Sequence, residues 1–161
     1  MPLVRLADTF FRVAGPNSLT TSTLLEHQSQ RLAPFLHIGD PQQRLARIVE
    51  EARHKPSLTP PARIETNRVE GCLVRVWFVP EFRAGKCFFQ CDSDAVSLKA
   101  VGGLVCELYS GHTPEEIAAF NSGVLKHLGV LHQLAENRQR TVARIEEKIR
   151  RFAQEHQTKA V

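Results

Sequence analysis

The residue best suited to do chemistry in this sequence is Cys72, which directly follows Gly71. The preceding stretch from Asn67 has the composition of a turn, and the alternating apolar pattern from Leu73 to Val79 predicts a β-strand after it. Glycine lets the backbone adopt positive φ, so we expect the cysteine at the junction of a loop and a strand. A small movement of the loop could then expose the thiol or cover it.

Packing is the simpler interpretation of any single cysteine, because buried thiols often serve as small apolar side chains. Four cysteines are present, at positions 72, 87, 91 and 106. Cys87 and Cys91 fall on one face of a predicted strand, Lys86–Cys91, and this makes a metal or cluster site the rival interpretation. Their Cα atoms would lie roughly 13 Å apart, which is far for two zinc–sulfur bonds of about 2.3 Å. No histidine spacing is typical of metal ligands, and we expect no bound metal.

Length and composition limit the class of protein. A chain of 161 residues has the size of one domain that needs no disulfide or metal to be stable. The net charge of +4 and the pI near 9.1 are mildly basic and, without a clustered basic face, do not indicate nucleic-acid binding. No apolar run approaches about 18 residues, so we expect no membrane contact. The cysteine pattern favours a reducing compartment, the cytoplasm, with organellar import as the alternative.

The elements around the thiol follow from apolar spacing and capping signals. Helices are predicted over 19–37 and 41–54, the second capped by Asp40. A proline-containing connection over 55–62 leads to the Asn67–Cys72 loop, and the strand after it is expected to end at Pro80, before a turn over 81–85. Asp92 or Ser93 is expected to cap the next helix, with Asp94 in its first turn.

Two further helices are predicted in the C-terminal third. Thr113 begins a capping box, with proline at the first helical position and Glu116 at the third. Asn137 is expected to cap the last helix, from 138 to about 157. For domain organisation we expect an N-terminal extension over 1–23, a single domain over 24–157 and a tail over 158–161.

Four motifs occur in an order that resembles the SufE family, sulfur-acceptor proteins that work with a cysteine desulfurase in iron–sulfur cluster assembly. They are Asn67-x-Val69-x-Gly71-Cys72-x-x-x-Val76-Trp77, Asp92-Ser93-Asp94-Ala95, Thr113-Pro114-Glu115-Glu116-Ile117, and Leu128-Gly129-Val130 followed by Leu134 and Arg138. The similarity covers about 30–152. The chain departs from the family at Val74 and Arg75, and it has Ala135-Glu136 and Arg140-Thr141 where the family commonly has Ser-Pro and Asn-Gly.

This resemblance implies an α+β fold, in which a small curved antiparallel sheet packs against several helices, as in the related U-type scaffold proteins. It also implies that Cys72 accepts sulfur from the persulfide of the desulfurase and passes it on. Because the attacking species is a thiolate, a cation near the sulfur would favour the reaction. The resemblance makes Arg138 that cation, with Arg68 and Arg75 as local alternatives. It gives Gly71, Asp94 and Arg138 loop-supporting or partner-binding roles, although a helix-start acid is an equally good interpretation of Asp94.

The partners follow from the same resemblance. The expected donor is a cysteine desulfurase of the SufS or CsdA type, which keeps its own pyridoxal phosphate, so this chain needs no cofactor. An iron–sulfur scaffold is the expected recipient, and the chain is expected to be a monomer or weak dimer. It would act as a sulfur carrier and desulfurase activator rather than as a stand-alone enzyme. Two alternatives remain: a metal- or cluster-binding scaffold of the U type, and a desulfurase adaptor that transfers no sulfur.

Overall fold

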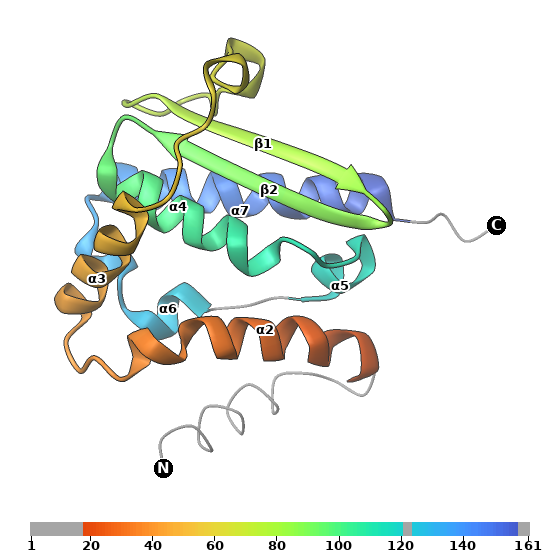
Figure 1. Ribbon diagram of the computed structural model, residues 1–161, viewed down its shortest axis with the longest axis horizontal. Helices are drawn as coiled ribbons and strands as arrows, with labels where there is room; N and C mark the ends of the chain where they lie inside the picture. Colours follow the sequence, from red (N-terminus) through yellow and green to blue (C-terminus); the bar gives the residue numbers. More distant parts are fainter. Residues whose placement is uncertain (1–17, 121–123, 158–161) are drawn as a thin grey trace.

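Two antiparallel strands lie across a layer of helices in the computed structural model, which describes residues 18–120 and 124–157 (Figure 1). The helices and strands, in order, are α2 (Ser18–Leu36), α3 (Pro41–Arg53), η1 (Pro60–Ala62), η2 (Glu65–Asn67), β1 (Val76–Arg83), β2 (Lys86–Ser93), α4 (Val96–Tyr109), α5 (Pro114–Ala119), α6 (Val124–Leu128), η3 (Leu131–Gln133) and α7 (Glu136–His156). This arrangement confirms the predicted α+β class. Residues 1–17 of the predicted extension and the predicted tail lie outside the described residues.

The hairpin is longer than the sequence predicted. β1 pairs with β2 from Val76 opposite Ser93 to Arg83 opposite Lys86, so the strand continues through Pro80. Pro80 lies opposite Phe89, whose N–H and C=O bond with the Ser110 hydroxyl on the side away from β1. Pro80 and Phe89 therefore form a non-hydrogen-bonded pair, in which both residues point their backbone groups away from the partner strand. The missing N–H of the proline therefore removes no bond from the sheet.

The start of β1 also differs from the prediction. The strand begins at Val76 rather than Leu73, so Cys72 lies inside a loop and not at a strand junction. The loop is closed at its base by the Val69 N–H, which donates to the Val76 carbonyl at 2.8 Å, and by a bridge between Arg68 and Trp77. The side chain at the tip, Leu73, is 86% exposed. The chain turns at Gly71, within this loop, where φ is +75°.

Capping signals predicted some helix ends and missed others. The Asp40 carboxylate accepts from the N–H groups of Gln42 and Gln43, and Thr113 and Glu116 form the expected capping box. The expected caps of α4 and α7 are wrong. Ala95 precedes α4, so Asp94 lies outside its first turn, and Ala135 precedes α7, so Asn137 lies inside that helix. Neither helix has a side-chain cap. Before α4, Asp92 and Asp94 make tertiary contacts instead.

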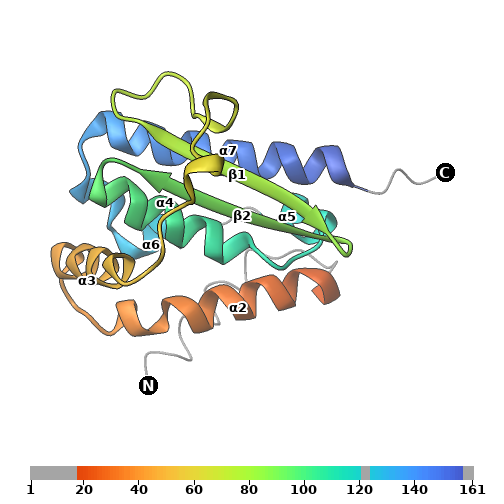
Figure 2. The same cartoon turned by 45° about the horizontal axis from the view of Figure 1, so that its top comes forward.

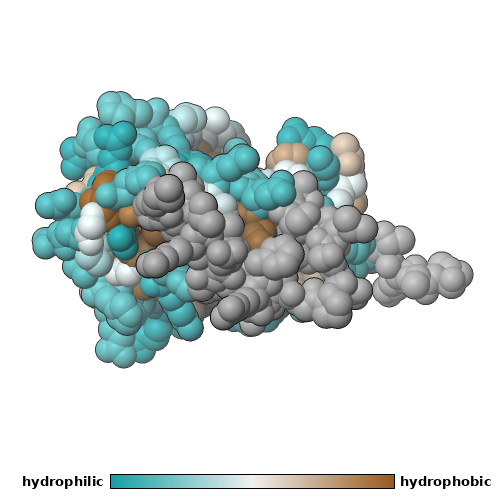
Figure 3. Space-filling view, turned by 90° about the horizontal axis from the view of Figure 1, so that it is seen from below, coloured by the Kyte–Doolittle hydropathy of each residue, from teal (hydrophilic) through white to brown (hydrophobic). Residues whose placement is uncertain are grey.

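The core lies between the sheet and α4, the most deeply buried helix. α4 packs under β2 and against α3 and α7, and α2 lies on the far side of α4 from the sheet (Figures 1 and 2). Close approach depends on Gly102, where a Cβ atom would lie 2.8 Å from Cys91 Sγ and 3.1 Å from Ile145 Cδ1. The described residues on the face that includes α2 are mostly hydrophilic (Figure 3). Within the described part of the chain, no helix has the length and apolar character to cross a membrane.

The proline-containing segment between α3 and η2 runs over the end of the sheet (Figure 2). Asp92, which is 1% exposed, fixes it: the carboxylate accepts from the Leu58 N–H at 3.0 Å and from Arg63 Nη2 at 2.5 Å. The Arg63 guanidinium also lies over the Trp77 ring, 5.0 Å from the centroid. This ion pair holds the segment that leads into the Cys72 loop against the sheet.

Candidate functional site

The Cys72 loop lies over the N-terminal half of α7, which supplies two polar side chains beside its sulfur, and the Glu70 carbonyl of the loop lies 3.9 Å from that sulfur. Cys72 is half-buried, and its Sγ lies 3.3 Å from Thr141 Oγ1 and 3.9 Å from Arg144 Nη1. Thr141 and Arg144 are three residues apart on α7, a spacing that puts two side chains on one helical face. The thiol therefore meets a buried hydroxyl and an exposed cation on the same helix.

Gly71 makes room for that cation. A Cβ atom at position 71 would lie 2.6 Å from Arg144 Nη1 and 3.1 Å from Cζ, distances shorter than van der Waals contact. The same Nη1 donates a hydrogen bond of 3.1 Å to the Glu70 carbonyl. The loop and the guanidinium therefore fit together because position 71 carries no side chain, and its positive φ independently favours glycine.

Asp94 and Ser93 hold the other end of the loop through Arg75. The Asp94 carboxylate accepts a hydrogen bond of 2.7 Å from Arg75 Nε, and the Asp94 N–H donates to the Arg75 carbonyl at 3.2 Å. The Ser93 hydroxyl donates to the same carbonyl at 2.8 Å. Three contacts from the end of β2 thus fix the residue that precedes β1. Asp94 thus lies beside the loop that carries Cys72.

The structure does not bring the three predicted cations to the sulfur. Arg138 donates to the Ser97 hydroxyl at 2.8 Å, which ties the first turn of α7 to the first turn of α4. Arg68 pairs with Glu65, and Arg75 pairs with Asp94. Arg144 is the cation that contacts Cys72, and sequence reasoning missed it. Arg144 lies 72 residues from Cys72 in the sequence, and the one signal in this region was the departure from the family pattern at Arg140-Thr141.

Two of the other cysteines are poor nucleophiles. Burial, with a smaller contribution from the Glu115 carboxylate, raises the pKa of Cys87 to about 11. Burial also raises the pKa of Cys106 well above its usual value, and a hydrogen bond with Cys91 acts in the same direction. Both thiols stay protonated at neutral pH, and the thiolate is the reactive form of cysteine. This leaves the half-buried Cys72 and Cys91.

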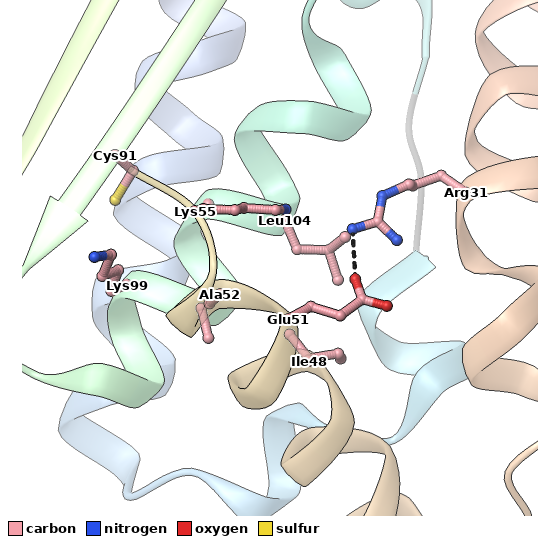
Figure 4. Close-up of a pocket in the computed structure, with 10 residues that line it drawn as sticks. Arg31, Ile48, Glu51, Ala52, Lys55, Cys91, Lys99 and Leu104 are labelled. Carbon is pink, nitrogen blue, oxygen red and sulfur yellow. Dashed lines mark hydrogen bonds and ion pairs between the residues drawn. The ribbon is translucent and has the colours of Figure 1, made fainter. Parts of the chain in front are cut away.

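Cys91 lies in the wall of a small cavity between α3, α4 and β2, where Arg31 is paired with Glu51 (Figure 4). The cavity has a volume of about 50 Å³, room for little more than water. Arg31 pairs with Glu51 at 3.0 Å, and Lys99 donates to the Ser57 hydroxyl at 2.8 Å. These contacts use both side chains as structural links. Cys72 is therefore the thiol best placed to meet another protein.

The residues that the structure describes do not gather a set of metal ligands. Within these ranges no three His, Cys, Asp or Glu side chains form a group that could hold a metal ion. All four cysteines are free thiols. The cluster-scaffold interpretation thus gains no support from the described geometry.

Fold and site together define a small α+β protein that presents one half-buried thiol on a loop braced by a neighbouring helix. The chain belongs to the SufE family, the Fe-S metabolism associated domain, which its residues 29–153 match. This membership confirms the resemblance seen in the motifs and associates the chain with iron–sulfur metabolism.

Individual relatives are distant in sequence. An uncharacterized SufE-like protein of Synechocystis is 24% identical over 120 residues, 74% of this chain and 76% of that protein. Another from Rhizobium etli is 26% identical over 129 residues, 77% of this chain and 87% of that protein. A chloroplastic quinolinate synthase of Arabidopsis thaliana is 29% identical over 119 residues, which are 73% of this chain but 17% of that enzyme.

A solved structure shares the fold. The solution structure of a hypothetical protein from Thermus thermophilus superposes with a TM-score of 0.65 at 21% identity, over 83% of this chain and 97% of that one. The similarity confirms the architecture of a small sheet packed on helices.

Proposed function

We propose that this protein accepts sulfur on Cys72 from a cysteine desulfurase and passes it on for iron–sulfur cluster assembly. The observation that carries the proposal is Cys72 itself, which lies within the matched SufE region, half-buried on a loop with a cation and a hydroxyl beside it. The raised pKa values of Cys87 and Cys106 support the same choice, since those thiols are held in the unreactive form.

In the proposed step the Cys72 thiolate attacks the terminal sulfur of the persulfide on the desulfurase. The sulfur–sulfur bond of the donor breaks and a new one forms on Cys72. The donor cysteine leaves as a thiolate with the bonding electron pair and takes up the proton of the transferred sulfur. Neutral sulfur moves from one thiolate to another, so no external oxidant or reductant is needed. The desulfurase supplies the pyridoxal phosphate chemistry that releases this sulfur from free cysteine.

The proposed compartment is the cytoplasm, where a reducing environment keeps thiols free. A related segment also occurs within an enzyme named as chloroplastic, which makes an organelle the alternative.

Intact-mass spectrometry tests the proposal. The purified chain is incubated with cysteine and a desulfurase of the SufS or CsdA type, and a mass gain of one sulfur atom is expected. The gain should disappear in Cys72→Ser and persist in Cys91→Ser, the matched control for the other half-buried thiol. A gain that persists in Cys72→Ser would place the sulfur on another of the free thiols and overturn the role of Cys72. Equal stimulation of sulfide release by wild type and Cys72→Ser, with no mass gain in either, would favour an adaptor that transfers no sulfur.

A further inference from the structure

The groups around the Cys72 sulfur differ in burial and in charge. Thr141 is 3% exposed and approaches the sulfur from the protein interior, whereas Arg144 is exposed and approaches it from the solvent side. The two contact distances are 3.3 Å and 3.9 Å. A hydrogen bond to sulfur is longer than one to oxygen, so the first is a close contact and the second a loose one.

Thr141 has one hydroxyl hydrogen and two acceptors within reach. Its Oγ1 lies 3.1 Å from the Asn137 carbonyl, one turn earlier in α7, as well as 3.3 Å from Cys72 Sγ. While the sulfur carries a proton, the hydroxyl can bond the carbonyl and accept from the thiol. Once the sulfur carries no proton it can only accept, and the hydroxyl can turn to donate to it. The same side chain therefore suits both states of the sulfur.

The Arg144 guanidinium is placed to pair with a negative charge on an atom bonded to the Cys72 sulfur. In a deprotonated persulfide the charge resides mainly on the terminal sulfur, which lies about 2.05 Å from the cysteine sulfur. The guanidinium stands 3.9 Å from Sγ, and its hydrogen bond to the Glu70 carbonyl fixes it there. A terminal sulfur that points toward solvent would come within ion-pair distance of this guanidinium.

We propose that Arg144 and Thr141 hold a persulfide on Cys72, with Thr141 donating to the cysteine sulfur and Arg144 pairing with the terminal sulfur. This inference rests on the proposed function, because it presumes that sulfur reaches Cys72. The ion pair with Arg144 lowers the free energy of the bound persulfide anion relative to the neutral persulfide. Loss of the sulfur to other thiolates is therefore slowed, because the neutral persulfide is the better electrophile. The pair thus keeps the sulfur on the loop until the recipient displaces Arg144.

The first experiment needs no desulfurase. Cys72 is loaded with inorganic polysulfide in a Cys91→Ser background, and the loss of the added sulfur to dithiothreitol is followed by intact mass. Arg144→Gln is expected to shorten the half-life of the added sulfur about two- to fivefold, the range for one exposed ion pair. Arg144→Lys should retain part of the effect because it keeps the charge. Arg151→Gln, an exposed α7 residue paired with Glu147, removes the same charge elsewhere and should match the parent protein.

The second experiment separates charge from hydrogen bonding on the unloaded thiol. Cys72 is alkylated at one pH with neutral iodoacetamide and with anionic iodoacetate. Arg144→Gln should lower the iodoacetate rate relative to the iodoacetamide rate, and added salt should abolish the difference. Thr141→Val should lower the alkylation rates with both reagents by the same factor, because valine keeps the shape of threonine but has no hydroxyl to donate to the sulfur. Thr141→Ser, which keeps the hydroxyl, should restore both rates.

The inference is overturned if Arg144→Gln and Arg151→Gln have equal half-lives, or if Thr141→Val behaves as the parent protein does. These outcomes differ from failure of the proposed function. If a desulfurase adds no sulfur to Cys72 but the polysulfide half-lives differ as expected, the acceptor role fails and the holding role stands. If sulfur is added and the half-lives are equal, the holding role fails alone.

Discussion

The fit between Gly71 and the Arg144 guanidinium makes the geometry at Cys72 depend on the absence of one methyl group. Gly71 combines a positive φ of +75° with a neighbour that a Cβ atom would approach to 2.6 Å. Gly85, in the hairpin turn, has nearly the same φ of +76° and open space around it. A side chain at Gly85 would therefore meet only the backbone cost of positive φ. A side chain at Gly71 would also meet the steric cost of the contact with Arg144.

Replacing each glycine by alanine should reveal this difference. We expect Gly71→Ala and Gly85→Ala each to lower the free energy of unfolding by about 1–2 kcal/mol, the cost of left-handed backbone for a residue with a Cβ atom. Only Gly71→Ala should also change the rate at which iodoacetamide alkylates Cys72, because the new methyl group displaces Arg144. Urea unfolding and alkylation kinetics measure the two effects. An equal change in alkylation for Gly85→Ala would show that the contact with Arg144 is not the cause.

The sequence predicted a loop at Cys72 but not the side chains that surround its sulfur, because those side chains come from a distant helix. Gly71 beside Cys72 is a local signal, whereas Arg144 reaches the thiol only because α7 packs along the sheet. The family resemblance pointed to Arg138, which lies six residues earlier and so about 9 Å further along the helix axis. At that position the side chain meets Ser97 on α4 instead.

The adjacent residues Gly102 and Gly103 of α4 differ in what they contribute. One allows close packing, and the other only lowers the intrinsic stability of the helix. A Cβ atom at Gly102 would meet the Cys91 sulfur and Ile145, whereas at Gly103 nothing lies within 4 Å. Gly102 therefore lets α4 approach β2 and α7 at once. Gly103 has no such neighbour and costs the helix intrinsic stability without a matching contact.

Opposite effects are expected from alanine at these two positions. Gly103→Ala should raise the free energy of unfolding by about 0.5–1 kcal/mol, because alanine has less backbone freedom to lose in a helix. Gly102→Ala should lower it by about 1–3 kcal/mol through overpacking. Chemical denaturation measures both. Stabilisation by both substitutions would mean that the contact with Cys91 relaxes freely.

Helix and strand limits were predictable where a local signal decides them. Asp40 and Thr113 cap the helices that follow them, because a short polar side chain before a proline at the first helical position satisfies the first N–H groups. Pro80 misled the prediction, because whether a proline breaks a strand depends on which way its nitrogen faces. Asn137 misled it as well, since α7 begins at Glu136, before the expected cap.

A chain of three side chains links elements that are far apart in the sequence. His27 of α2 and His112, before α5, share a hydrogen bond of 2.9 Å between Nδ1 and Nε2, and His112 Nδ1 lies 3.1 Å from the Glu116 carboxylate of α5. Burial lowers the pKa of His112, an effect that His27 and the Lys86 ammonium strengthen and Glu116 opposes. The folded protein therefore favours the neutral imidazole.

This lowered pKa predicts a loss of stability in acid. Below the ordinary histidine pKa of about 6.5 the unfolded chain binds a proton that the folded chain resists, so stability falls as the pH drops from there through the lower folded pKa. We expect the thermal midpoint of wild type to fall more between pH 7 and pH 5 than that of His112→Gln. His54→Gln, an exposed control, should follow wild type. Parallel curves for wild type and His112→Gln would exclude this imidazole as the source.

The proline in β1 and the backbone bridge beside β2 also bear on self-association. An isolated two-stranded sheet has two open edges, each a template on which a foreign strand could add. Along β2, Gly111 and His112 already occupy the N–H and C=O of Cys87. Along β1, an incoming strand would meet Pro80 midway, where no donor exists. Each edge of the hairpin therefore offers a foreign strand an interrupted row of backbone groups, which disfavours edge-to-edge aggregation.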